Sequence, residues 1–150
     1  MDEGLALRLC ALTGEFYRAN AESFSQTRQS PWQGWVRLLE VMDARAAERE
    51  LLRVLDVACG NGRFLRFLQE ALPGAAIAYF AVDDCEQLAR DGLVGDADNV
   101  AFQKLDIANS LIDDSIERAI EAPPVDMAVC FGFFHHIPGA DSRAALLRAL

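Results

Sequence analysis

The chain has 150 residues and a mass of 16.5 kDa, is 52% hydrophobic and 25% charged, and carries a formal net charge of −9. This is the composition of one soluble globular domain, and it excludes a disordered tail, a collagen and a coiled coil. Because no apolar stretch reaches the ~18 uninterrupted residues of a spanning helix, and the acidic start Met1-Asp2-Glu3 is unlike a secretory signal peptide, we expect a cytoplasmic protein without a membrane partner.

The first part of the chain predicts helices. Apolar residues recur at helical spacing over residues 3–27, as in one helix or in two helices broken near Gly14. Ser30 followed by Pro31 is typical of an N-cap and a first helical position, and predicts a second helix. We assign residues 1–52 to an N-terminal helical cap or lid.

From residue 53 onward, short apolar strands alternate with amphipathic helices. The pattern predicts strands at 53–58, 76–82, 99–105 and 125–131, and helices at 62–72, 85–91, 113–120 and 140–150. Such alternation is typical of an α/β domain in which helices cover both faces of a parallel sheet.

The segment from Val54 to Phe64 is the most informative, because a buried strand runs into Gly60-x-Gly62 and a helix begins at once. Glycines allow positive φ and a close approach of a ligand to the backbone. The helix N-terminus then offers free N–H groups to negative charge. A ligand site is therefore expected beyond the carboxyl end of this strand.

A dinucleotide-binding domain uses a related turn, but its third glycine would stand where this chain has Leu65. Asp56 lies inside the strand end, where a buried carboxylate is costly unless it meets donors or a cation. A ligand with an aminium and a sulfonium would supply a cation. A nicotinamide-dependent oxidoreductase is therefore the less favoured alternative.

Three aspartates end successive strands: Asp56, Asp83 and Asp106. A carboxylate in the position of Asp83 can accept both hydroxyl groups of a ribose, which a neutral side chain does less well. The three together predict a ligand site at the carboxyl edge of the sheet.

The motifs DVACGNGRF, AVDD, LDIA and VDMAVCFGFFHHIP, in this order, resemble those of class I S-adenosylmethionine-dependent methyltransferases over residues 53–150. The resemblance implies a Rossmann-like fold with sheet order 3-2-1-4, and S-adenosyl-L-methionine as cofactor. By the same resemblance, Asp56, Ala58, Gly60 and Gly62 would surround the methionine part, Asp83 and Asp84 the ribose, Asp106 and Ile107 the adenine, and Phe131 the floor near the methyl group. Ala58 replaces a commoner glycine, and we expect little loss from it.

The upstream segment, with Phe24-Ser25-Gln26-Thr27-Arg28 ahead of Pro31-Trp32, is similar to the tRNA wobble-uridine carboxymethyl methyltransferases and their bacterial look-alikes. In that family the segment closes over the cofactor. The resemblance implies that Tyr17, Arg28 and Trp32 are lid residues, with Arg28 as a candidate partner of the methionine carboxylate. The alternative is an amphipathic helix that carries an arginine on its solvated side.

No catalytic residue is assigned, because methyl transfer from a sulfonium mainly needs positioning. His135 and His136 are weak candidates that would orient the nucleophile of an amine or hydroxyl acceptor, and structural roles before Pro138 are favoured. A carboxylate acceptor would already be ionised. The cysteines, Cys10, Cys59, Cys85 and Cys130, have neither the spacing of a zinc site nor that of a disulfide framework, so no metal is expected.

The charge distribution bears on the acceptor. Residues 1–80 carry 9 basic and 10 acidic side chains, and residues 81–150 carry 5 and 13. This argues against DNA binding and favours a neutral or cationic small acceptor, whereas the N-terminal segment indicates tRNA. The predicted function is S-adenosylmethionine-dependent methyl transfer to an O or N acceptor of either kind. The alternative is a cofactor-binding homologue or fragment without catalysis.

The resemblance also predicts what this chain lacks. Class I methyltransferases continue with strands 5 to 7, which are absent here, so we expect a piece of a longer fold or a fold that another chain completes. The strand at 125–131 would then lie at an open edge of the sheet, where association with another chain is expected.

Overall fold

The computed structural model describes residues 2–93 and 99–150 and places a four-stranded parallel sheet at the centre of the chain. The strands are β1 (Leu52–Val57), β2 (Ile77–Asp83), β3 (Val100–Lys104) and β4 (Met127–Val129), in the order β3-β2-β1-β4. The predicted α/β fold with sheet order 3-2-1-4 is therefore confirmed. Asp56 pairs in register with Ala81 on one side and Val129 on the other, so three strands end almost level.

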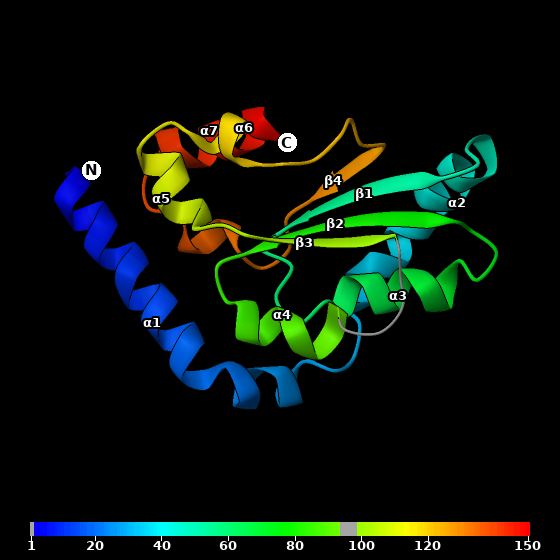
Figure 1. The fold of residues 1–150 in the computed structure, drawn as a ribbon, viewed down its shortest axis with the longest axis horizontal. Helices are drawn as coiled ribbons and strands as arrows, with labels where there is room; N and C mark the ends of the chain where they lie inside the picture. Colours follow the sequence, from blue (N-terminus) through cyan, green and yellow to red (C-terminus); the bar gives the residue numbers. More distant parts are fainter. Residues whose placement is uncertain (1, 94–98) are drawn as a thin grey trace.

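Helices cover both faces of the sheet (Figure 1). The helical elements in chain order are α1 (Glu3–Thr27), η1 (Gln33–Leu38), α2 (Leu39–Glu48), α3 (Arg63–Ala71), α4 (Glu86–Leu93), α5 (Ile107–Ile112), α6 (Ile116–Ala119), η2 (Phe134–His136) and α7 (Ala140–Ala149). In Figure 1, α3 and α4 lie on one side of the sheet and α5, α6 and α7 on the other. None of the helices within residues 2–93 and 99–150 is long and apolar enough to span a membrane.

Alternate residues of β1 point into two separate hydrophobic cores, as the period of a strand requires. Leu52 and Val54 pack with residues of η1, α2 and α3, whereas Leu55 and Val57 pack with residues of α5, α6 and α7. Asp56 shares the face of Leu52 and Val54, and it is only 2% exposed. An ionisable group therefore lies inside a core, at the end of the central strand.

Helix α1 passes the carboxyl ends of the strands and contacts both α4 and α5 (Figure 1). Asp2 caps it by accepting a hydrogen bond from the backbone N–H of Leu5. The helix is continuous across Gly14, where a break was considered, and its non-helical residue is Asn20, at φ −119° and ψ 16°. This placement brings the cap segment onto the same edge of the sheet as the glycine turn.

Other boundaries differ from those predicted. The second helix does not start at Pro31, because Trp32 stays extended and residues 33–38 form a 3-10 helix before α2. The helix expected at 113–120 is shorter and forms α6, whereas α5 was not predicted. The fourth strand, expected at 125–131, is ordered as a strand only over Met127–Val129, at the edge of the sheet beside β1.

Candidate functional site

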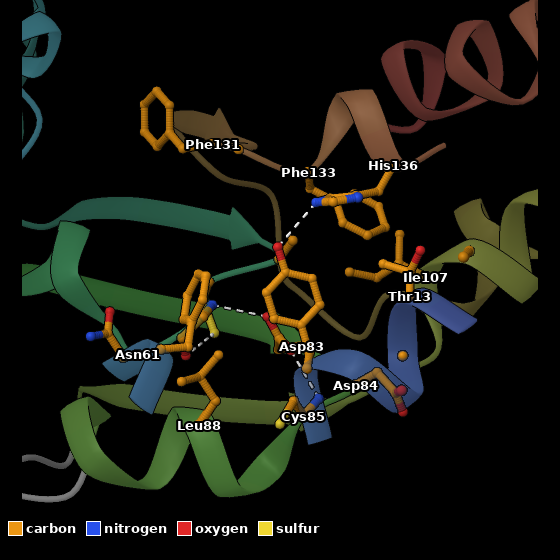
Figure 2. A pocket seen from close by; sticks show the side chains of 18 of the residues that line it. Thr13, Asn61, Asp83, Asp84, Cys85, Leu88, Ile107, Phe131, Phe133 and His136 are labelled. Atoms are coloured by element: carbon orange, nitrogen blue, oxygen red, sulfur yellow. Dashed lines mark hydrogen bonds between the residues drawn. The ribbon is translucent and has the colours of Figure 1, made fainter. Parts of the chain in front are cut away.

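A cavity of about 330 Å³ opens at the carboxyl edge of the sheet. Residues after all four strands line it, and α1 forms a further wall (Figure 2). It brings together Tyr17, Arg28, Trp32, Asp56, Ala58, Gly60, Asp83, Asp84, Asp106, Ile107, Phe131, His135 and His136. These were predicted as site residues from motifs scattered over more than half of the chain. Their roles toward a ligand remain predictions.

The glycine turn is built from residues in the left-handed region. Ala58, Gly60 and Gly62 have φ of 63°, 56° and 66°. The backbone N–H groups of Ala58 and Cys59 donate to the carbonyl of Val82, at 2.8 and 3.2 Å, which holds the turn against the end of β2. Ala58 is the strained member, since a residue with a Cβ in this region costs about 1–2 kcal/mol. The expectation that alanine replaces glycine at position 58 with little loss rested on the small size of its side chain. It did not include this cost in backbone strain.

Gly62 lies outside the lining of the cavity. A Cβ atom on it would come within 2.8 Å of the Leu93 side chain and 3.1 Å of the Gly92 backbone. In this structure the missing side chain makes room for α4, which packs directly on the turn. Gly60 is different, because it lines the cavity. A Cβ atom on Gly60 would have the Leu88 side chain as its nearest neighbour, at 3.9 Å.

Asp83 holds the glycine turn with one carboxylate oxygen and the segment before α4 with the other. Its Oδ2 accepts from the N–H of Gly60 and its Oδ1 from the N–H of Cys85, both at 2.9 Å (Figure 2). Burial raises the pKa of the Asp83 carboxyl, and these two hydrogen bonds counteract the rise. Each oxygen can accept a further hydrogen bond, so the carboxylate can still receive donors from a ligand in the cavity.

Asp84 and Asp106 are already partnered within the protein. Asp84 Oδ2 lies 2.7 Å from Arg18 Nη1, an ion pair that joins the end of β2 to α1. Asp106 is the N-cap of α5 and accepts from the backbone and side-chain nitrogens of Asn109, at 3.0 and 2.8 Å. Ile107, next in the chain, is buried and lines the cavity. Asp84 and Asp106 thus shape this end of the cavity through protein contacts.

Asp56 has a partner that the sequence analysis did not identify. The hydroxyl of Tyr79 donates a hydrogen bond to Asp56 Oδ2 inside the core. The pKa of Asp56 is raised to about 7, because burial and, to a smaller extent, the charge of Asp83 raise it more than the tyrosine hydrogen bond lowers it. Asp56 is therefore near its titration midpoint at neutral pH, and a cation bound in the cavity would favour its ionised form.

This raised pKa predicts a pH dependence of stability. The Asp56 pKa of about 7 in the folded chain stands against 3.8 for an ordinary aspartate carboxyl. Between these values the folded state binds more protons than the unfolded state, so the free energy of unfolding falls as pH rises from about 4 to about 7. The shift corresponds to about 4 kcal/mol at most. Urea denaturation at pH 5 and pH 8 measures the loss.

The matched variant is Asp56→Asn, which keeps the shape and cannot ionise. Its stability should decline less between pH 5 and pH 8 than that of the unchanged chain. Equal pH dependence in the two proteins would show that Asp56 is not the titrating group.

The opposite end of the cavity is aromatic and cationic. The ring of Phe131 lies 4.9 Å from that of Phe64 and 5.3 Å from that of Trp35. The guanidinium of Arg63 lies over Trp32 and Trp35, at 5.0 and 5.3 Å from the ring centroids. The indole N–H of Trp35 is buried without an acceptor among the described residues. This end therefore offers flat apolar surfaces together with unused donors.

Arg28 and Arg63 both line the cavity, and neither forms an ion pair within the part of the chain that the structure describes. Burial lowers the pKa of Arg63, and the nearby positive charges of Arg28 and Arg66 lower it further. Arg28 also stacks over Phe24, at 4.5 Å. Two mutually repelling cations without a counter-charge provide a site that favours an anion.

Arg63, Trp35 and Asn61 were missed by the sequence analysis. Arg63 directly follows Gly62 at the first position of α3. Its place beside the glycine turn could have marked it as a residue of the site. Asn61 is buried, and its Nδ2 donates to the Arg28 carbonyl at 3.1 Å, which ties the glycine turn to the end of the cap segment. Trp35 lies in the 3-10 helix, and no local pattern indicates that its ring lines the cavity.

The two histidines contribute differently. The hydroxyl of Tyr17 and the Nε2 of His136 are 3.0 Å apart, so α1 is tied to the segment after β4 (Figure 2). Burial, with a smaller effect of His135, lowers the pKa of His136. The lowered pKa favours the uncharged ring, which can accept a hydrogen bond from the Tyr17 hydroxyl. His135 is exposed and contacts His136, with ring centroids 3.9 Å apart and ring planes tilted by 41°.

Comparison with known proteins gives three similarities. A family model described as a methyltransferase domain matches residues 55–150. The mouse (Mus musculus) tRNA (carboxymethyluridine(34)-5-O)-methyltransferase ALKBH8 is 24% identical over 137 residues, which are 91% of this chain and 17% of that protein. A solved structure of a DhpI–SAH complex superposes with a TM-score of 0.58 at 19% identity, over 94% of this chain and 63% of that chain. The chain thus spans less than two thirds of either relative.

Proposed function

Since the chain belongs to the methyltransferase domain family, we propose that it transfers a methyl group from S-adenosyl-L-methionine to a carboxylate oxygen of an acidic acceptor. The family and the likeness to a protein in complex with SAH support methyl transfer with this cofactor. The acceptor class is the further step, and the unpaired cations Arg28 and Arg63 carry it.

The residues of the cavity fit the cofactor. The Asp83 carboxylate at one end retains free acceptor capacity for ribose hydroxyls. The Gly60 backbone lines the cavity where a ligand can approach closely, and the buried Asp56 offers negative charge to the amino and sulfonium groups. Arg28 also lines the cavity and is available for a carboxylate.

The cofactor supplies an electrophilic methyl group that needs no further activation. The chain itself has to align the acceptor and to keep water out of the cavity. The packed rings of Phe131, Phe64 and Trp35 give the floor an apolar surface that does not bind water. A carboxylate acceptor is ionised at neutral pH, so one of its oxygens would use a lone pair to form the new O–CH₃ bond as the methyl–sulfur bond breaks and neutral S-adenosylhomocysteine leaves. No proton has to be removed, and none of the protein's groups has to act as a base.

Two cations favour a second anion beside that of the cofactor. The cofactor carries a single carboxylate, for which Arg28 is the candidate partner. Arg63 remains, held over Trp32 and Trp35 by stacking, and a guanidinium in this position can hold a carboxylate by paired hydrogen bonds. The unpartnered Trp35 N–H beside it also favours an acceptor oxygen at this end. A carboxymethyl group on tRNA and a free small acid share this chemistry.

Replacing Arg63 with glutamine is expected to reduce methyl-ester formation by about 100-fold, because a charge-assisted bidentate contact is lost. The affinity for S-adenosylhomocysteine should stay within about threefold. Methylation is measured with labelled cofactor in two arms, bulk tRNA and a panel of small carboxylic acids, and esters are recognised because alkali releases their label.

Arg45→Gln is the matched control, since Arg45 pairs with Glu48 on α2, outside the cavity. It should leave methylation unchanged in both the tRNA arm and the small-acid arm. Alkali-stable methylation would identify an amine or another hydroxyl acceptor and would contradict the proposal, as would equal activity of Arg63→Gln.

A further inference from the structure

Helix α1 carries an apolar stripe on its exposed side. Leu5, Leu9, Leu12 and Phe16 are 50%, 42%, 63% and 58% exposed. Their spacing of four, three and four residues places them in one row along the helix, as in the seam of two paired helices. Four large apolar side chains in a row, each at least two-fifths exposed, form a surface that indicates association.

A neighbouring face of α1 is already used by the protein. Ala6 and Ala21 are buried, and Cys10, Thr13 and Tyr17 line the cavity. Among the described residues, the stripe is therefore not the part of the helix that packs on the sheet or lines the cavity. It is a second, separate face of the same helix.

We propose that this stripe pairs with the α1 stripe of a second copy of the chain, with the two helices antiparallel around a two-fold axis. The charges beside the stripe support a second copy as the partner. Arg8 and Glu15 flank it, both are exposed, and neither forms an ion pair among the residues that the structure describes.

An antiparallel arrangement uses these two charges. A two-fold axis that crosses the stripe between Leu9 and Leu12 sets Leu9 against Leu12 of the partner subunit. The same axis brings Arg8 near Glu15 of the partner subunit, and symmetry repeats this pair on the other side. In a parallel pair the two copies of this flank would lie on opposite sides of the seam, so Arg8 and Glu15 would not meet.

The alternative of an anionic lipid surface is disfavoured by charge. The chain carries −9 overall, and the helix has Asp2, Glu15 and Glu22 along with its arginines. An acidic protein is repelled by such a membrane, which attracts basic amphipathic helices. A homodimer needs no basic face.

The interface is small, because one row of four side chains per copy lies below the area of stable dimers. We therefore expect a reversible dimer with a dissociation constant on the order of 1–100 μM. Sedimentation equilibrium between 1 and 200 μM measures it. The single variants Arg8→Glu and Glu15→Arg should each weaken the dimer about tenfold or more, because each places like charges across the axis.

The double variant Arg8→Glu with Glu15→Arg restores both pairs with the signs exchanged, so it should regain the dimerisation of the unchanged chain. Leu12→Glu should abolish dimers, and Val41→Glu on the exposed side of α2 should not affect them. Circular dichroism of each variant shows that it folds. The proposal would be overturned if the unchanged chain were monomeric at 200 μM, or if the single charge reversals did not weaken the dimer. It would also be overturned if the double variant did not regain dimerisation, or if the chain bound anionic vesicles without forming dimers.

Discussion

Replacing Asp83 with alanine is expected to weaken binding of S-adenosylhomocysteine by at least about 100-fold. Each hydrogen bond to a charged group contributes about 1.5–3 kcal/mol, and the carboxylate is available to two ribose hydroxyls. The variant also leaves the N–H groups of Gly60 and Cys85 without their acceptors, so the glycine turn loses its anchor. Isothermal titration calorimetry measures the change.

Two further variants separate the direct contact of Asp83 with the ligand from its support of the glycine turn and from the effect of a neighbouring charge. Asp83→Asn keeps one acceptor oxygen and the shape of the side chain, so its affinity should fall between those of alanine and the unchanged chain. Asp84→Ala removes only the partner of Arg18 at the surface of α1, and it should change affinity by less than about tenfold. If Asp83→Ala folds and binds normally, the assigned role of Asp83 is wrong.

Replacing Gly92 with alanine is expected to destabilise the chain, against the usual preference of helices. Replacing glycine with alanine within a helix normally increases the free energy of unfolding by about 1 kcal/mol. Here a Cβ on Gly92 would overlap the carbonyl oxygen of Asn61, which also accepts from Arg66 Nη1 at 3.0 Å. Either α4 or the glycine turn must move, so we expect a loss of about 3 kcal/mol of unfolding free energy and weaker ligand binding.

The chain offers matched controls for Gly92. At Gly34 and Gly74, the position that a Cβ would take has no packing neighbour within 4 Å among the described residues, and φ is not positive. Gly34→Ala and Gly74→Ala should therefore leave stability and binding almost unchanged in urea denaturation and calorimetry. A stabilised Gly92→Ala would show that α4 does not pack on the turn as described.

The sheet could be predicted because its signals are local. Each strand is an apolar run ended by an aspartate or a glycine turn, and the carboxyl ends of parallel strands necessarily share one edge. Asp56, Gly60 and Asp83 were therefore expected together, and they line one cavity. The motif resemblance supplied the strand order, which periodicity alone does not determine.

Other features depend on contacts between distant segments. Tyr79 and Asp56 meet because β1 and β2 pair in a register that puts both on the same face, and no local pattern states that register. Helix α5 spans only Ile107–Ile112, too short for a periodic signal. The extended Trp32 contradicted the expected helix start at Pro31, because its ring packs between Arg63 and Phe131 instead.

The cavity at the carboxyl edge of the sheet is expected to bind the cofactor of methyl transfer. Calorimetry of the unchanged chain with S-adenosylhomocysteine, and in parallel with NADH, measures this binding. We expect one molecule of S-adenosylhomocysteine bound per chain and no heat from NADH. Binding of NADH without binding of S-adenosylhomocysteine would contradict this expectation.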